Sequence, residues 1–152
     1  MSQDIFNIAP VFYGMALIPK ESWKDYGCAL LIIAGADGEV SDPELEWLTI
    51  SLSKALEVDE STVALWEEYD FEEEDLYEVF GRIDSRSVAS FSKLLIYDAI
   101  RMSYADDDYA DDERERVGEA ASMLKLEKEA VLAIEALVEH ERATDKLRSV
   151  IL

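Results

Sequence analysis

The sequence is poor in basic residues, and this shortage narrows the range of partners. Only 14 lysine and arginine residues stand against 35 aspartate and glutamate residues, which leaves a formal net charge of −21. A surface this negative repels phosphate backbones and anionic lipids, so we expect no nucleic-acid partner. Cations and basic protein surfaces are favoured instead, although the same charge also serves solubility without any specific partner.

Histidine and cysteine occur once each, which leaves little material for side-chain catalysis. His140 falls within an expected helix, where a lone histidine is typically a surface residue. Cys28 lies in an apolar run, so we expect a buried thiol and no internal disulfide. No glycine-rich phosphate loop is present, and paired carboxylates would need an apolar cleft to act in hydrolysis. We therefore expect no enzymatic activity.

Long apolar segments are also missing. The longest apolar run near the middle of the chain, residues 28–34, is far shorter than the roughly 20 residues that cross a bilayer. Residues 1–7 have no basic region ahead of an apolar stretch, so no secretion signal is predicted. These features and the single cysteine predict a cytoplasmic protein without direct membrane insertion. The length of 152 residues predicts one domain, 1–152, with a substantial core.

What the sequence does contain is apolar residues at helical spacing, with no strand-like alternation, so the predicted class is all-α. Ser41 with Glu44 forms a capping box before the second long helix, and Ser87 is expected to cap another. The glutamates after Phe71 are expected in the first turn of a short helix, where the helix dipole favours them. The predicted helices cover residues 11–18, 21–34, 43–56, 60–66, 71–80, 88–102, 111–124 and 127–143.

Two parts of the chain resemble each other. Residues 36–44 align with residues 105–113 at an offset of 69, and residues 55–60 align with residues 123–128 at an offset of 68. The matches predict a duplicated unit, in which the two copies pack as one core because neither buries its apolar face alone. The predicted divisions are repeat one at about 23–69, a connecting segment at about 70–86, and repeat two at about 87–143.

Each copy carries a cluster of carboxylates just before and at the start of a helix. The candidate metal ligands are Asp37, Glu39, Asp42 and Glu44 in the first loop, and Asp106, Asp108, Asp111 and Glu113 in the second. Clustered carboxylates repel one another, a cost that a cation removes, and a site rich in oxygen suits Ca²⁺, Mg²⁺ or Mn²⁺. The opening of each loop resembles an EF-hand, but the loops are too short to be one.

A simpler interpretation of the acidic loops needs no metal. Aspartate and serine at a helix start accept hydrogen bonds from free backbone N–H groups, and glutamate in the first turn interacts with the positive helix end. This accounts for the acids at and after each helix start. It accounts less readily for those that precede the cap, which are Asp37, Glu39, Asp106, Asp107 and Asp108.

The segment from Leu30 to Glu44, which contains Ala-Gly-Ala-Asp-Gly-Glu-Val-Ser-Asp-Pro-Glu, resembles the TerB-like, tellurite-resistance-associated family. The segment from Ile96 to Asp106 and the pair Glu113-Arg114 carry the same resemblance, which spans about residues 23–141. It implies a single-domain bundle of about seven helices with a role in bacterial tellurite or stress resistance. The acidic positions that carry over from the family are Asp37, Glu39, Glu44, Asp106, Asp108 and Glu113.

The resemblance also implies divalent metal binding through the acidic loops and action with protein partners, including membrane-associated ones. Ca²⁺, Mg²⁺, Mn²⁺ and Zn²⁺ are the candidate metals. Asp107 departs from the family pattern because it stands where the first loop has Gly38, and a turn with positive φ tolerates aspartate less well than glycine. Three hypotheses follow: a divalent-cation-binding stress-response domain, a metal-free acidic adaptor that docks basic partner surfaces, and a purely structural duplicated bundle.

Overall fold

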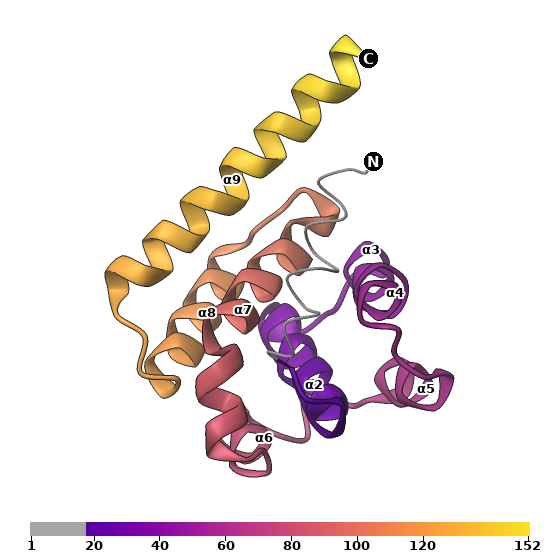
Figure 1. Ribbon diagram of the computed structural model, residues 1–152, viewed down its shortest axis with the longest axis vertical. Helices are drawn as coiled ribbons and strands as arrows, with labels where there is room; N and C mark the ends of the chain where they lie inside the picture. The colour runs from indigo at the N-terminus through magenta and orange to yellow at the C-terminus, as the bar shows by residue number, and fades with distance from the viewer. Residues whose placement is uncertain (1–17) are drawn as a thin grey trace.

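The computed structural model describes residues 18–152, and every regular element in this range is helical (Figure 1). This confirms the predicted all-α class. The helix expected at residues 11–18 lies almost wholly outside the described residues. The α-helices are α2 (Trp23–Ala34), α3 (Asp42–Glu46), α4 (Ser53–Leu56), α5 (Glu60–Glu68), α6 (Leu76–Gly81), α7 (Ser85–Ser103), α8 (Asp111–Met123) and α9 (Lys128–Ile151).

Shorter elements complete the described range. A π-helical stretch, η4 (Trp47–Leu52), joins α3 to α4 without a break, so the range holds seven helices when the three are counted as one. Short 3₁₀ turns precede α2 and follow α2 and α7: η2 (Lys20–Ser22), η3 (Gly35–Asp37) and η5 (Tyr104–Asp106). Within residues 18–152 no helix is both long and apolar enough to cross a membrane.

Helix α2 forms the centre of the bundle because it is apolar on all sides. Its residues from Tyr26 to Ala34 are all buried, and it contacts α5, α6, α7 and α8. The Tyr26 hydroxyl donates to the buried Asp98 carboxylate of α7 at 2.6 Å, and its ring meets Phe91 edge to face. Cys28 is buried here as expected, and burial raises the pKa of its thiol to about 12, which makes it unreactive.

Two helix starts differ from the prediction. The helix expected over residues 71–80 begins only at Leu76, because Asp75 and Glu78 form a capping box that sets its first turn. The glutamates after Phe71 therefore lie in a loop and not in the helix. Helix α7 begins at Ser85, since Asp84 and not Ser87 is its cap.

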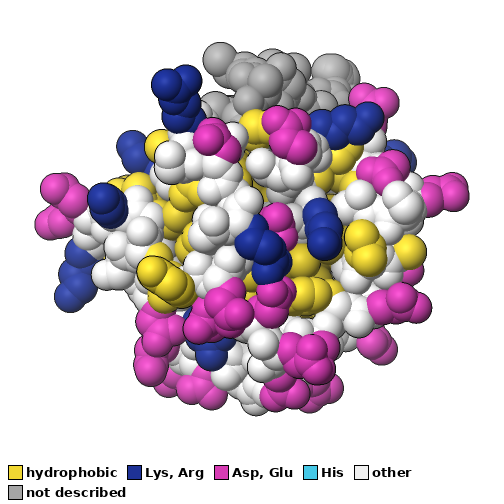
Figure 2. All heavy atoms as spheres, turned by 90° about the horizontal axis from the view of Figure 1, so that it is seen from below, with side chains coloured by type: hydrophobic (Ala, Val, Ile, Leu, Met, Phe, Trp, Pro, Cys, Tyr) yellow, Lys and Arg dark blue, Asp and Glu magenta, His cyan; other side chains and the backbone are white. Residues whose placement is uncertain are grey.

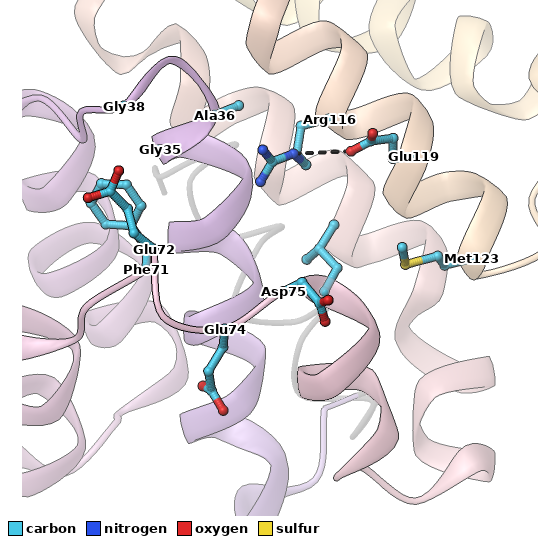
Figure 3. Close-up of a pocket in the computed structure, with 11 residues that line it drawn as sticks. Gly35, Ala36, Gly38, Phe71, Glu72, Glu74, Asp75, Arg116, Glu119 and Met123 are labelled. Carbon is cyan, nitrogen blue, oxygen red and sulfur yellow. Dashed lines mark ion pairs between the residues drawn. The ribbon is translucent and has the colours of Figure 1, made fainter.

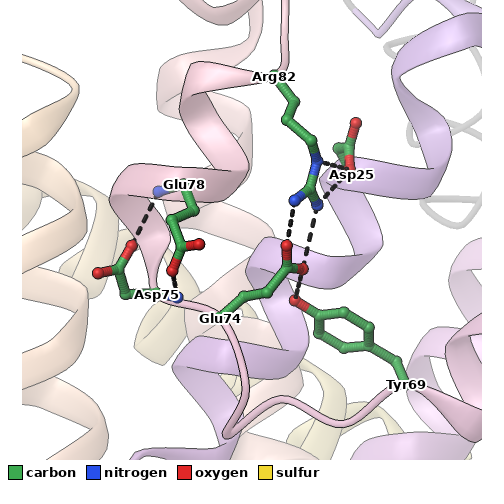
Figure 4. Close-up of polar contacts among 6 residues, drawn as sticks. All are labelled: Asp25, Tyr69, Glu74, Asp75, Glu78 and Arg82. Atoms are coloured by element: carbon green, nitrogen blue, oxygen red, sulfur yellow. Dashed lines mark hydrogen bonds and ion pairs between the residues drawn. The ribbon is translucent and has the colours of Figure 1, made fainter.

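The loop before α6 is anchored to α2 by Arg82 (Figure 4). The Arg82 guanidinium bonds to Asp25 of α2 at 2.8 Å and also pairs with Glu74, whose carboxylate accepts from the Tyr69 hydroxyl at 2.6 Å. The bond from Arg82, and then that from Tyr69, lowers the pKa of Glu74 below its ordinary value. This anchor places the loop beside the first acidic turn, and so helps to shape the surface near it.

Candidate functional site

The two acidic loops follow the same backbone course, although most of their residues differ. In the first, η3 is followed by Gly38 in the left-handed region at φ 97°, and Asp37 Oδ1 accepts from the Glu39 amide at 3.2 Å. In the second, η5 is followed by Asp107 at φ 65°, and Asp106 Oδ1 accepts from the Asp108 amide at 3.1 Å. The aspartates that open the loops therefore stabilise turns, as the simpler interpretation would have it.

Each loop then enters a helix with a glutamate at the third helical position. Glu44 Oε1 accepts from the Ser41 amide at 2.9 Å, and the Ser41 hydroxyl accepts from the Glu44 amide at 3.3 Å. Glu113 Oε1 accepts from the Ala110 amide at 3.0 Å, but Ala110 has no side-chain oxygen to return the bond. Both glutamate side chains are thus turned back towards the chain that precedes their helix.

The loops meet, because α3 contacts η5 while α8 contacts η3. Glu44 and Glu113 lie at this junction, each with only 2% of its surface exposed, and their carboxyl groups hydrogen-bond to each other. Two residues 69 positions apart in the sequence therefore form one buried carboxyl pair. A pair of this kind is held by a shared proton or by a cation, since two bare carboxylates in contact would repel each other.

Burial is the main cause of the raised pKa values of this pair. Burial, followed by the hydrogen bond to Glu44, raises the pKa of Glu113 from its ordinary 4.5 to about 9. Burial also raises the pKa of Glu44, against the opposing effect of the hydrogen bond from Glu113. Asp106 and Asp37 add negative potential, the first at Glu44 and the second at Glu113. Because the pKa of each carboxyl group is raised, we expect the pair to share a proton at neutral pH.

The remaining candidate ligands do not join this pair. Asp37 and Asp106 are exposed and support their own turns. The others lie on the surface: Glu39, Asp42, Asp108 and Asp111. Across residues 18–152 no three acid, histidine or cysteine side chains gather as a ready metal-binding group. Metal binding by the eight candidate ligands stays a prediction. Glu44 and Glu113 differ from the other six because they are buried.

The sequence contains a signal for the buried pair, although the loop pattern alone does not distinguish these two glutamates from the other acids. Glu44 lies one helical turn before Leu48, and Glu113 lies one turn before Val117. Leu48 and Val117 are fully buried. Residues four apart share a helix face, so each glutamate belongs to the apolar face of its helix.

The second loop is also held by helix α9, which the first loop does not contact in this way. Arg142 of α9 bonds to Asp107 Oδ1 at 3.0 Å and to the Tyr104 carbonyl at 3.3 Å, and its guanidinium lies over the Tyr104 ring. The Tyr109 hydroxyl donates to Glu135 of α9 at 3.0 Å. These bonds connect helix α9 to a turn that uses aspartate where the first loop has glycine.

We expect Asp107→Gly to raise the free energy of unfolding by up to about 1 kcal/mol. The left-handed φ costs an L-residue roughly that amount, and the lost ion pair with Arg142 is worth little because 80% of the Asp107 side chain is exposed. Urea denaturation checks this. Asp108→Gly is the matched control, since Asp108 has no positive φ and should lose stability through chain entropy. A clear loss in Asp107→Gly would show that the ion pair outweighs the strain.

Comparison with known proteins agrees with this architecture. No protein-family model matches the chain, and no curated protein matches it either. Among solved structures, a tellurite resistance protein from Nostoc punctiforme is similar, with 23% sequence identity and a TM-score of 0.76. The likeness covers 99% of this chain and 95% of that one. The chain therefore has the fold of a tellurite resistance protein, as its resemblance to TerB-like domains implies.

Proposed function

We propose that this chain is a bacterial stress-response domain, associated with tellurite resistance, that binds a divalent cation between Glu44 and Glu113 and acts through protein partners. The observation that supports the cation is the buried carboxyl pair at the junction of the two loops. The fold that the chain shares with a tellurite resistance protein supports the physiological setting.

The donor set consists of carboxylate oxygens, which suit a hard cation. Two carboxyl groups come from different loops, and Asp37 and Asp106 make the local potential more negative. Mg²⁺ and Ca²⁺ are bound through oxygen ligands, whereas Zn²⁺ favours nitrogen and sulfur ligands. Glu44 and Glu113 would hold the ion directly. Binding would replace the proton that the pair shares, so affinity should increase with pH.

Calorimetric titration with Mg²⁺, Mn²⁺, Ca²⁺ and Zn²⁺ tests the cation. We expect binding heat, release of about one proton per ion, and a rise in melting temperature that grows between pH 6 and 9. The double variant Glu44→Gln with Glu113→Gln should lose all three effects, while Glu39→Gln, an exposed acid of the first loop, should keep them. Absence of both heat and thermal stabilisation at every pH would reject the cation site.

The metal-free acidic adaptor is the second candidate, and one observation favours it. A single proton already satisfies the Glu44–Glu113 pair, so the fold is complete without a cation. The net charge of −21 then directs the chain to basic partner surfaces. Under this alternative, partner binding weakens with added salt but is unchanged by a chelator and by Asp37→Asn combined with Asp106→Asn. Loss of partner binding on chelation would reject it.

A further inference from the structure

A groove runs between the first acidic turn and helix α8, away from the carboxyl pair. Its volume is about 450 Å³, and it is lined by η3, the loop before α6 and the C-terminal half of α8 (Figure 3). Phe71 and Met123 supply apolar surface, and the Phe71 ring packs so closely on Gly35 that a Cβ there would lie 2.3 Å from it. This volume lies within the range of about 300–1,000 Å³ that is usual for ligand pockets.

The groove is negatively charged. Its acidic lining residues are Glu72, Glu74, Asp75 and Glu119, against one basic residue, Arg116. Arg116 pairs with Glu119 at 3.1 Å and donates to the Ile32 carbonyl at 3.3 Å, and Glu74 pairs with Arg82. The negative charge that remains for an occupant is therefore that of Glu72 and Asp75. Seen from below, the molecule presents separate apolar patches among acidic side chains and several basic ones (Figure 2). The occupant that complements such a groove carries apolar and basic side chains together.

The last turns of helix α9 have that combination. Leu147, Val150 and Ile151 are 61%, 83% and 74% exposed, and they lie three and four residues apart on one helix face. From Arg142 to Leu152 the chain has three basic residues and one acid, in contrast to its acidic whole. Arg142 is used by the second loop and Arg148 pairs with Asp145 at 3.1 Å, whereas Lys146 has no ion pair with any residue from 18 to 152.

A chain cannot place its own α9 end in its own groove. The residues that line the groove run from η3 to the start of α6, within the body of the molecule. Helix α9 extends past the body, and its C-terminal end lies away from these elements (Figure 1). We propose that the groove receives the α9 end of a second copy of this chain. Leu147, Val150 and Ile151 would cover Phe71 and Met123, and Lys146 and Arg148 would face the acidic rim.

This contact joins two different surfaces, so it leaves a free groove on one copy and a free α9 end on the other. Such heterologous contacts produce chains or rings of subunits rather than closed twofold dimers. The assembly should weaken as salt is added, because opposite charges face each other across the rim. The proposal does not depend on the carboxyl pair or on a bound cation.

Sedimentation velocity of the full chain from about 1 μM to about 1 mM tests the assembly. We expect mass to increase with concentration beyond a dimer. The groove variant Glu72→Lys with Glu119→Lys and the end variant Leu147→Gln with Val150→Gln should each weaken association about tenfold or more. All four positions are exposed, so both variants should fold, which circular dichroism checks. Glu67→Lys, an exposed acid of α5, is the control.

Mixing the two variants gives the decisive result. The groove variant keeps an intact α9 end, and the end variant keeps an intact groove, so their mixture should form a 1:1 dimer that cannot grow further. A chain that stays monomeric over the whole concentration range overturns the proposal. So does association that the groove variant leaves unchanged, or a mixture that stays monomeric, since either result would place the contact elsewhere.

Discussion

Glu113→Gln is expected to make the folded domain more stable than the wild type at alkaline pH, by about 2–4 kcal/mol at pH 9. Glutamine keeps the shape of the protonated glutamate. Its amide oxygen can still accept from the Ala110 amide, and its NH₂ group can donate to Glu44. The variant therefore reproduces the neutral state of the buried pair at every pH.

The direction of this effect follows from proton binding. The pKa of Glu113 is about 9 in the folded chain and near the ordinary 4.5 in the unfolded chain. Between these values the folded state binds a proton that the unfolded state has released, so the free energy of unfolding decreases as pH rises. The stabilising contribution is complete below about pH 4.5 and is lost by about pH 9. Glu113→Gln removes this dependence.

Urea denaturation at several pH values between 5 and 9 measures this pH dependence of the free energy of unfolding. The buffer contains a chelator so that no cation replaces the proton. The control is Glu115→Gln, which makes the same substitution at an exposed position of the same helix. The free energy of unfolding of this variant should change with pH as that of the wild type does. A wild-type free energy of unfolding that does not change between pH 5 and 9 would show that the two carboxyl groups do not share a proton.

Gly27→Ala is expected to lower the free energy of unfolding by about 2–3 kcal/mol, although alanine is the better helix former. A Cβ at this position of α2 would lie 2.1 Å from Cε2 of Trp66. The ring is held in place, since it is 1% exposed and its indole N–H donates to the Lys24 carbonyl at 3.0 Å. Overpacking of a core costs about 1–3 kcal/mol or more, which exceeds the roughly 1 kcal/mol gained in helix propensity.

Gly118→Ala is the matched substitution and should have the opposite sign. Gly118 lies in α8, where an added Cβ meets nothing within 4 Å. The propensity gain is then unopposed, and we expect about 0.5–1 kcal/mol of stabilisation. Thermal unfolding followed by circular dichroism separates the two, with Gly27→Ala melting roughly 5–10 °C lower. Equal effects of both substitutions would contradict the tight fit of Trp66 on α2.

The helices and their capping were predictable because they depend on neighbours along the chain. The helix start at Ser41 and Glu44 was predicted and is present, since a capping box needs only residues three apart. The late start of α6 at Leu76 was not predicted. Asp75 caps this helix, and the pairing of Glu74 with Arg82, which follows α6, holds the preceding residues in a loop.

The sequence also indicated that the two loops are equivalent, and the two turns do share a left-handed residue and an aspartate that accepts from the amide two positions on. Duplication of the whole unit stays a prediction. For the site, eight acidic residues were candidates, and the apolar helix face that Glu44 shares with Leu48 and Glu113 with Val117 was not used to rank them. The structure ranks them by burial, which separates Glu44 and Glu113 from acids that lie in water.

By itself, the sequence determined that this protein is helical and acidic, with two carboxylate-rich turns at helix starts. Each of these follows from local hydrogen bonding, apolar periodicity and charge count. Only the tertiary structure decided that one glutamate from each turn meets the other in the core, and that a groove and an exposed helix end lie at opposite ends of the molecule. Those relations join residues many positions apart, and they depend on how the helices pack around α2.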